Sequence, residues 1–135
     1  MTLRLVLLRD NEVLWEMPLY TSGWLRSELD EELEELENDF DKLSIIFDAL
    51  SNKNRLLMMK TLLEEEEATL HFSDLMRELK MNPKVVRESA VKLRSGGFLK
   101  QPDRGEYKCS QTGQISFFTI TLALRRLLNS LEELE

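Results

Sequence analysis

The sequence has very little of the residues that carry most catalytic and metal chemistry. Its 135 residues include one cysteine, Cys109, and one histidine, His71. A single cysteine cannot form an internal disulfide, and one cysteine with one histidine gives none of the paired spacings that bind zinc. The sequence therefore predicts no metal site, no cofactor and no enzyme, and its cysteine usage is typical of a cytoplasmic protein.

Glycine, proline and long apolar runs are scarce as well. The five glycines stand at 23, 96, 97, 105 and 113, where each fits a turn or a helix end, so none forms a phosphate-binding loop. No apolar run approaches the roughly 20 residues that a membrane-spanning helix needs, so no membrane contact is expected. Acids are plentiful in 28–41, but acids at helical spacing are more often a solvated face than a general acid–base pair.

Charge is unevenly distributed along this acidic chain, whose formal net charge is −7. Residues 1–44 hold four basic and twelve acidic residues, a net charge of −8, whereas 45–135 hold 14 basic and 13 acidic residues, a net charge of +1. Residues 84–108 alone carry seven Lys and Arg against three acids. Because salt screens charges beyond roughly 10 Å, such a basic surface can bind phosphate although the whole chain is acidic. The total still argues against non-specific coating of nucleic acid.

The first third of the chain predicts an extension, residues 1–43, made of a β-hairpin and an acidic helix. β-forming residues fill 2–8 and 12–17 on either side of the turn "RDNE". Apolar residues then recur every three or four positions, which predicts one long helix over 25–50, with Ser44 able to cap a new helix inside it. This seam fits one core-facing helix or a dimer interface, and a small core favours the dimer. The seam consists of Leu25, Leu29, Leu33, Leu36, Phe40, Leu43, Phe47 and Leu50.

Residues 44–135 predict a second, mainly helical domain with little β-structure, an α+β fold. A helix over 51–67 is capped by Ser51 or Asn52, and a second follows an extended start within 68–81 and is capped by Ser73. The inner face of the 51–67 helix is expected to hold Leu56, Met59, Leu62 and Leu63, and Met58 and Met59 are expected to fill the core.

The helix over 83–95 has the clearest local signals in the chain. Asn82 is a good N-cap, Pro83 suits the first helical position, and Gly96–Gly97 ends the helix. Two short strands, 98–102 and 106–110, are expected around the turn "DRG", followed by a closing helix over 112–135. The buried face of helix 83–95 is expected to hold Val86, Ala90 and Leu93.

This order of elements predicts a winged helix-turn-helix. In that arrangement, helix 83–95 enters the major groove of duplex DNA, and the wing, 98–110, lies on the flanking backbone or in the minor groove. Arginine suits contacts with base edges better than lysine does, because its planar guanidinium matches the guanine edge. The candidate DNA-binding residues are Lys84, Arg87, Glu88, Lys92, Arg94, Lys100, Arg104 and Lys108.

Two segments resemble the ArsR-type winged helix-turn-helix transcriptional regulators. "FDALSNKNRLLMMKTLL" (47–63), with Arg55, is similar to the "LxALSDPTRLxILxLL" opening of that family, and 79–113, with "LRSGGFL", is similar to its recognition helix, exit and wing. The resemblance covers about residues 44–113. It implies a sequence-specific DNA-binding regulator that forms a homodimer through its terminal helices. The dimerisation residues it implies are Leu29, Leu33, Leu36, Phe40, Phe117, Leu124, Leu128 and Leu131.

The sequence departs from that family at two places. "LHFSDL" (70–75) has His71 and Ser73 where metal-sensing members carry the thiolates of a "CxC", so metal sensing is not expected. The usual Ser-x-His-Leu of the recognition helix is replaced by residues 87–90, Arg-Glu-Ser-Ala, so the family's sequence preference does not carry over.

Two other interpretations stay open from the sequence. The domain could be a winged helix used for protein contacts in a transcription or chromosome-associated assembly. The acidic first third and Glu88 inside the proposed DNA-facing surface both favour this. The first third itself fits either a dimer strut that repels non-specific DNA or a dock for a basic protein partner. A redox or ligand sensor would use Cys109, but a lone cysteine in a strand is most often a small apolar residue.

Overall fold

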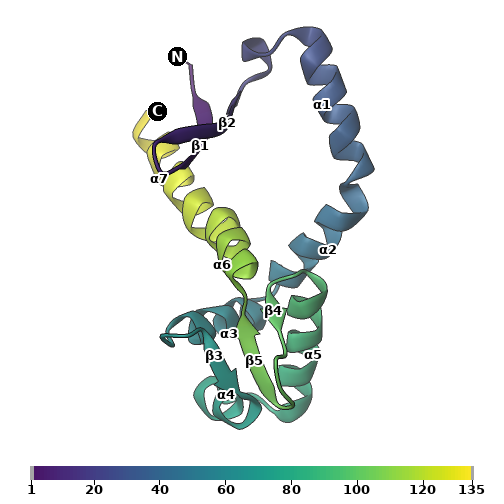
Figure 1. Cartoon of the computed structure of the whole chain (residues 1–135), viewed down its shortest axis with the longest axis vertical. Helices are drawn as coiled ribbons and strands as arrows, with labels where there is room; N and C mark the ends of the chain where they lie inside the picture. The colour runs from purple at the N-terminus through teal and green to yellow at the C-terminus, as the bar shows by residue number, and fades with distance from the viewer. Residues whose placement is uncertain (1, 135) are drawn as a thin grey trace. The chain divides into compact units, whose positions relative to one another are not determined.

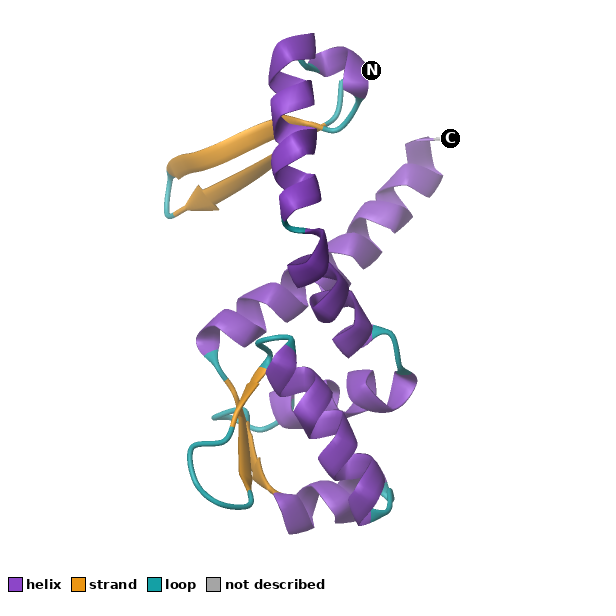
Figure 2. Ribbon diagram, turned by 90° about the vertical axis from the view of Figure 1, so that its right-hand side faces the viewer, coloured by secondary structure: helices purple, strands orange, loops and turns teal. Residues whose placement is uncertain are grey.

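The computed structural model describes residues 2–134, and the chain divides into two compact units, Met1–Asp41 and Lys42–Glu135. In the first unit, β1 (Arg4–Arg9) and β2 (Glu12–Pro18) form the expected hairpin, a two-stranded antiparallel sheet that Figure 2 shows as a separate pair of strands. Asp10 at the turn adopts a positive φ of 57°, which a short polar side chain tolerates. A short helical turn, η1 (Thr21–Gly23), leads into α1 (Arg26–Asn38).

The single helix expected over 25–50 is in fact two helices. α1 ends at Asn38 and α2 (Phe40–Leu50) follows, with Asp39 between them at φ −99° and ψ 5°. The Asp39 N–H donates to the Leu36 carbonyl at 3.0 Å, a tighter turn than the α-helical one. Asn and Asp side chains compete for backbone hydrogen bonds, so the break falls at Asn38–Asp39 rather than at Ser44.

The second unit has the element order of a winged helix, as Figure 1 shows. After α2 come α3 (Lys53–Leu63), β3 (Thr69–His71), α4 (Phe72–Leu79), α5 (Pro83–Ser95), β4 (Leu99–Lys100) and β5 (Glu106–Cys109). The three strands form an antiparallel sheet with β5 in the middle, in the order β3-β5-β4. The closing helix continues through α6 (Gln111–Phe118), a wider π-helical segment (Thr119–Ala123) and α7 (Leu124–Leu134). The predicted α+β winged-helix fold is confirmed.

The core lies between the sheet and helices α2 to α6. The expected buried face of α5 is confirmed, with Val86, Ala90 and Leu93 at most 1% exposed. In α3, however, Leu56 is 37% exposed and was wrongly assigned inward, while Met58 is fully buried. Because α3 contacts α4, α5 and the sheet, its buried face is wider than one stripe.

Two helix ends differ from the sequence expectation for identifiable reasons. α3 is capped by Asn52, whose Oδ1 accepts from the Asn54 N–H at 2.8 Å, but it ends at Leu63 instead of 67. α4 begins at Phe72, before the expected cap at Ser73. The Phe72 N–H donates to the Gly105 carbonyl at 2.6 Å. The first backbone N–H of α4 is therefore paired with a carbonyl of the wing and not with a local side chain.

Phe98 connects α5, the wing and the closing helix. Its ring is fully buried, and its N–H donates to the Leu93 carbonyl at 2.9 Å, which closes the C-terminus of α5. Gly97 provides the positive φ, 82°, that this ending requires. Gly113 in α6 lies so close to Phe98 that a Cβ there would overlap the Phe98 carbonyl oxygen and come within 3.0 Å of its Cα.

Gly113→Ala is therefore expected to destabilise the domain by about 1–3 kcal/mol, the usual cost of overpacking a rigid site. The clash is with backbone, which cannot swing aside as a flexible side chain can. Urea unfolding measures the change. The exposed Thr112→Ala in the same helical turn is the control and should stay within about 0.5 kcal/mol. Equal stability of both variants would contradict the close approach.

Candidate nucleic-acid interface

α5 is fixed at its start and presents its outer face to solvent. Asn82 Oδ1 accepts from the Val85 N–H at 2.9 Å, and Pro83 occupies the first helical position, as predicted. With Val86, Ala90 and Leu93 on the core, the opposite face is exposed. The side chains on that face are Lys84, Arg87, Glu88, Val91 and Lys92.

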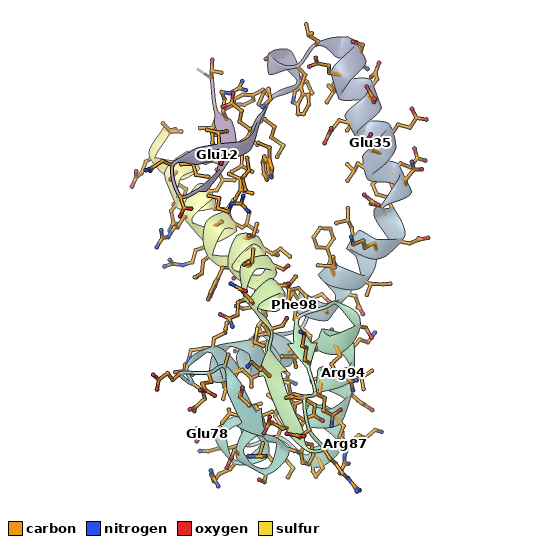
Figure 3. The ribbon with its side chains drawn as sticks, viewed as in Figure 1. Glu12, Glu35, Glu78, Arg87, Arg94 and Phe98 are labelled. Atoms are coloured by element: carbon orange, nitrogen blue, oxygen red, sulfur yellow. The ribbon has the colours of Figure 1, made fainter. Side chains whose placement is uncertain are left out.

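Arg87 is held where α4 and α5 meet. Its guanidinium lies over the Phe72 ring, 5.0 Å from the ring centroid, and Figure 3 shows it at the outer, N-terminal end of α5. Such a cation–π contact restricts the side chain without neutralising its charge. Lys84 is more loosely held, with its Nζ 3.9 Å from Glu88 Oε1. The N-terminal half of α5 therefore carries two cations and one acid at its surface.

Two further predicted DNA-binding residues have partners inside the domain. Lys92 Nζ donates to Asp48 Oδ2 at 2.7 Å, and this bond, with the charge of Lys92, lowers the pKa of the Asp48 carboxyl. Arg94, also labelled in Figure 3, donates to Gln101 Oε1 at 3.0 Å. Lys92 thus connects α5 to α2, and Arg94 connects it to the wing.

The wing brings the remaining three predicted cations together. Lys100 and Lys108 lie directly opposite each other on β4 and β5, and Arg104 is exposed in the turn between the strands. Like charges facing each other across a ladder are destabilising, and a bound anion would relieve this repulsion. Glu66 and Glu67 line the same hollow as the two lysines and offset part of this charge.

Sequence reasoning did not find two features of this surface. Val91 is 59% exposed in the middle of the outer face, although an apolar residue on a core-packed helix is expected to be buried. Beside it, the N-terminus of α3 and the outer face of α5 line a hollow of about 560 Å³ that includes Asn52 and Asn54. Only the tertiary arrangement of α3 and α5 brings these residues together, so no sequence signal marks the hollow.

Arg55, singled out in the sequence as a point of resemblance, serves the fold. Its Nε donates to the Ala49 carbonyl and one terminal nitrogen to the Asp48 carbonyl, both at 2.8 Å. The arginine thus satisfies two carbonyls at the C-terminus of α2, where a positive charge is also favoured.

Cys109 is buried in β5, facing Leu99 on β4. Burial raises the pKa of its thiol to about 11, so the thiol stays protonated at neutral pH. Because the thiolate is the reactive form, this environment disfavours a redox role. Among residues 2–134, no helix is long and apolar enough to cross a membrane.

The residues expected at a dimer interface fall into two groups. Leu29 and Phe117 are largely buried within the chain, at 8% and 9% exposure, and Phe117 belongs to the core. Leu131 is half-buried. The others, Leu33, Leu36, Phe40, Leu124 and Leu128, are 41–52% exposed. The dimerisation role of this set stays a prediction.

The contact between Lys92 and Asp48 predicts a specific pH dependence of stability. A carboxyl whose pKa is lowered by folding contributes stability above its unfolded pKa, and loses it as pH falls through the folded pKa. The stability advantage of the natural chain over Lys92→Met should therefore shrink as pH falls from about 5 to about 2.

Urea unfolding at several pH values measures this difference. Arg94→Met is the matched control, since its partner Gln101 does not ionise, and its stability difference should change less over the same range. Parallel behaviour of the two variants would contradict a specific Lys92–Asp48 contribution.

No protein-family model matches the sequence, and no curated protein matches it significantly. Solved structures do match. The homodimeric winged helix-turn-helix DNA-binding domain Mb0332 from Mycobacterium bovis, a possible ArsR-family transcriptional regulator, is 18% identical over 64% of this chain and 81% of its own, with a TM-score of 0.55. Sco5413, a MarR family transcriptional regulator from Streptomyces coelicolor, is 13% identical over 81% of this chain and 82% of its own, with a TM-score of 0.52. The fold is thus one that two regulator families share, and the likeness does not select ArsR over MarR.

Proposed function

We propose that this chain is a sequence-specific double-stranded DNA-binding transcriptional regulator that acts as a homodimer and is not an enzyme. α5 would lie in the major groove with Lys84, Arg87 and Glu88 at base edges or phosphates. The wing would lie on the flanking backbone or in the minor groove through Lys100, Arg104 and Lys108. Mb0332, whose fold is similar, is described as a homodimeric DNA-binding domain, which supports this proposal.

The observation that carries the proposal is the placement of free cations on an otherwise acidic chain. Arg87 is stacked on Phe72 and has no carboxylate partner among the described residues. The three wing cations also lack a carboxylate partner there: Lys100, Arg104 and Lys108. An exposed cation without a partner is where a phosphate or a guanine edge gains most. Glu88 and Val91 suit bases instead, because a carboxylate accepts from cytosine and an apolar side chain contacts the thymine methyl.

The dimer is proposed to form through the closing helix. Leu124, Leu128 and the half-buried Leu131 follow one another at helical spacing along α7, so two copies could bury this stripe against each other. A two-fold dimer would place two α5 helices about one DNA turn apart, on a near-palindromic site.

A winged helix for protein contacts remains the second candidate, favoured by one observation. Lys92 is already paired with Asp48, which leaves the C-terminal half of α5 less cationic than its sequence indicates. The exposed Val91 then lies on a face that a protein could also cover.

Selection from random duplex DNA, followed by a salt titration of the enriched sequence, separates the two functions. A DNA-binding regulator should enrich a near-palindromic motif and lose affinity steeply with salt, because each phosphate contact releases counterions. Absence of enrichment, with only weak binding that modest salt removes, would favour the protein-contact function.

Arg87→Ala and Arg104→Ala are expected to have different effects on the enriched site. Loss of Arg87 should weaken specific binding by about 1–3 kcal/mol and relax preference at one base position. Loss of Arg104 should weaken binding to all duplexes evenly and lower the salt slope by about one. Fluorescence anisotropy on matched and mismatched duplexes measures both. Small, equal effects on every duplex would contradict sequence-specific reading by Arg87.

A further inference from the structure

The apolar stripe of α1 is largely uncovered. Leu33 and Leu36 are 48% and 41% exposed, and Leu25 just before the helix is 67% exposed. Phe40, the first residue of α2, is 52% exposed. Only Leu29, at 8% exposure, is covered. A helix with one apolar stripe is stabilised mainly by packing that stripe against another surface. Most of the α1 stripe is therefore left uncovered by the first unit itself.

The residues beside this stripe are all acidic. In the heptad pattern with Leu33 and Leu36 in the seam, the flanking positions of α1 hold Asp30 and Glu37 on one side and Glu32 on the other. Asp39 lies in the break that follows the helix. Arg26 pairs with Asp30 at 3.2 Å, and this is the one ion pair of α1 among the described residues. The other two flanking carboxylates, Glu32 and Glu37, thus have no cationic partner within the part of the chain that the structure describes.

A second copy of α1 is a poor occupant for electrostatic reasons. In a parallel pair, Glu32 of one copy would face Glu37 of the other. In an antiparallel pair, the flanking acids on each side would again face only acids. Flanking charges set partner choice in paired helices, and like charges there oppose pairing. The same carboxylates would repel nucleic acid and anionic lipid.

We propose that α1 is a docking site for a basic amphipathic helix of another protein. Such a helix would place its own apolar stripe on Leu33 and Leu36, and Lys or Arg beside Glu32 and Glu37. This contact uses none of the proposed DNA-binding residues, so it does not depend on the DNA-binding function. It leaves the proposed dimer contact to the closing helix.

Two designed peptides of about 21 residues, three heptads, test the proposal on the full chain. Both carry leucine at the seam positions, but one has lysine and the other glutamate at the flanking positions. The lysine peptide should bind, and its affinity should fall at least about tenfold between about 50 and 300 mM salt, because exposed charges are screened. The glutamate peptide should bind at least about tenfold more weakly at the lower salt concentration.

Two charge-matched double variants locate the contact. Glu32→Lys with Glu37→Lys reverses the flanking charges. This variant should no longer bind the lysine peptide and should bind the glutamate peptide instead. Glu31→Lys with Glu34→Lys makes the same change in net charge on the opposite face of α1 and should keep the original preference. All four positions are exposed, and circular dichroism checks that both variants remain folded.

Three outcomes would overturn the proposal: no binding of the lysine peptide, equal loss in both double variants, or dissociation of a homodimer by Leu36→Asp in sedimentation. The last would assign the stripe to a second copy. Affinity for the selected DNA, measured on the same variants, keeps the two proposals separate. If the lysine peptide does not bind but the selected DNA does, only the docking site is rejected. If the peptide binds but no DNA does, only the DNA-binding function is rejected.

Discussion

The buried ring of Phe98 is the constraint on which the arrangement of α5, the wing and the closing helix depends. Its N–H ends α5 at the Leu93 carbonyl, and its own carbonyl is so close to α6 that position 113 must be glycine. On the other side, a Cβ at Gly96 would come within 3.1 Å of the Phe98 ring and 2.9 Å of Ala49 in α2. The orientation of the proposed recognition surface relative to the closing helix is therefore set by backbone packing, which surface substitutions leave unchanged.

The cations of this surface divide by what they contact. Lys92 and Arg94 contact Asp48 and Gln101 and so help to position α5, whereas Arg87 and the wing cations have no carboxylate partner among residues 2–134. Residues of the first kind would thus also act on DNA through the position of α5, and those of the second kind would act by direct contact. A count of basic residues in 84–108 does not make this distinction, because it depends on acids and amides elsewhere in the chain.

Local chemistry could be predicted from the sequence, and tertiary contacts could not. The bounds of α5 followed from Asn82, Pro83 and the two glycines, whose effects need no distant partner. The start of α4 was missed because it depends on the Gly105 carbonyl, 33 residues further along the chain. The partner of Lys92 was missed for the same reason, since Asp48 is 44 residues away in the sequence. The expected core position of Met58 is confirmed, whereas the inward assignment of Leu56 is wrong, because α3 packs on more than one neighbour and a single apolar stripe does not reveal this.

The division of charge between the two units has a consequence for specificity. An acidic first unit opposes the approach of any duplex, whatever its sequence, and so lowers non-specific affinity. Binding would then depend on contacts that only a matched site supplies, such as those of Arg87, Glu88 and Val91 with base edges. A basic helix bound to α1 would neutralise part of that repulsion. If both proposals hold, a protein partner at α1 would raise DNA affinity without contacting DNA, and linkage requires that DNA raise affinity for that partner by the same factor.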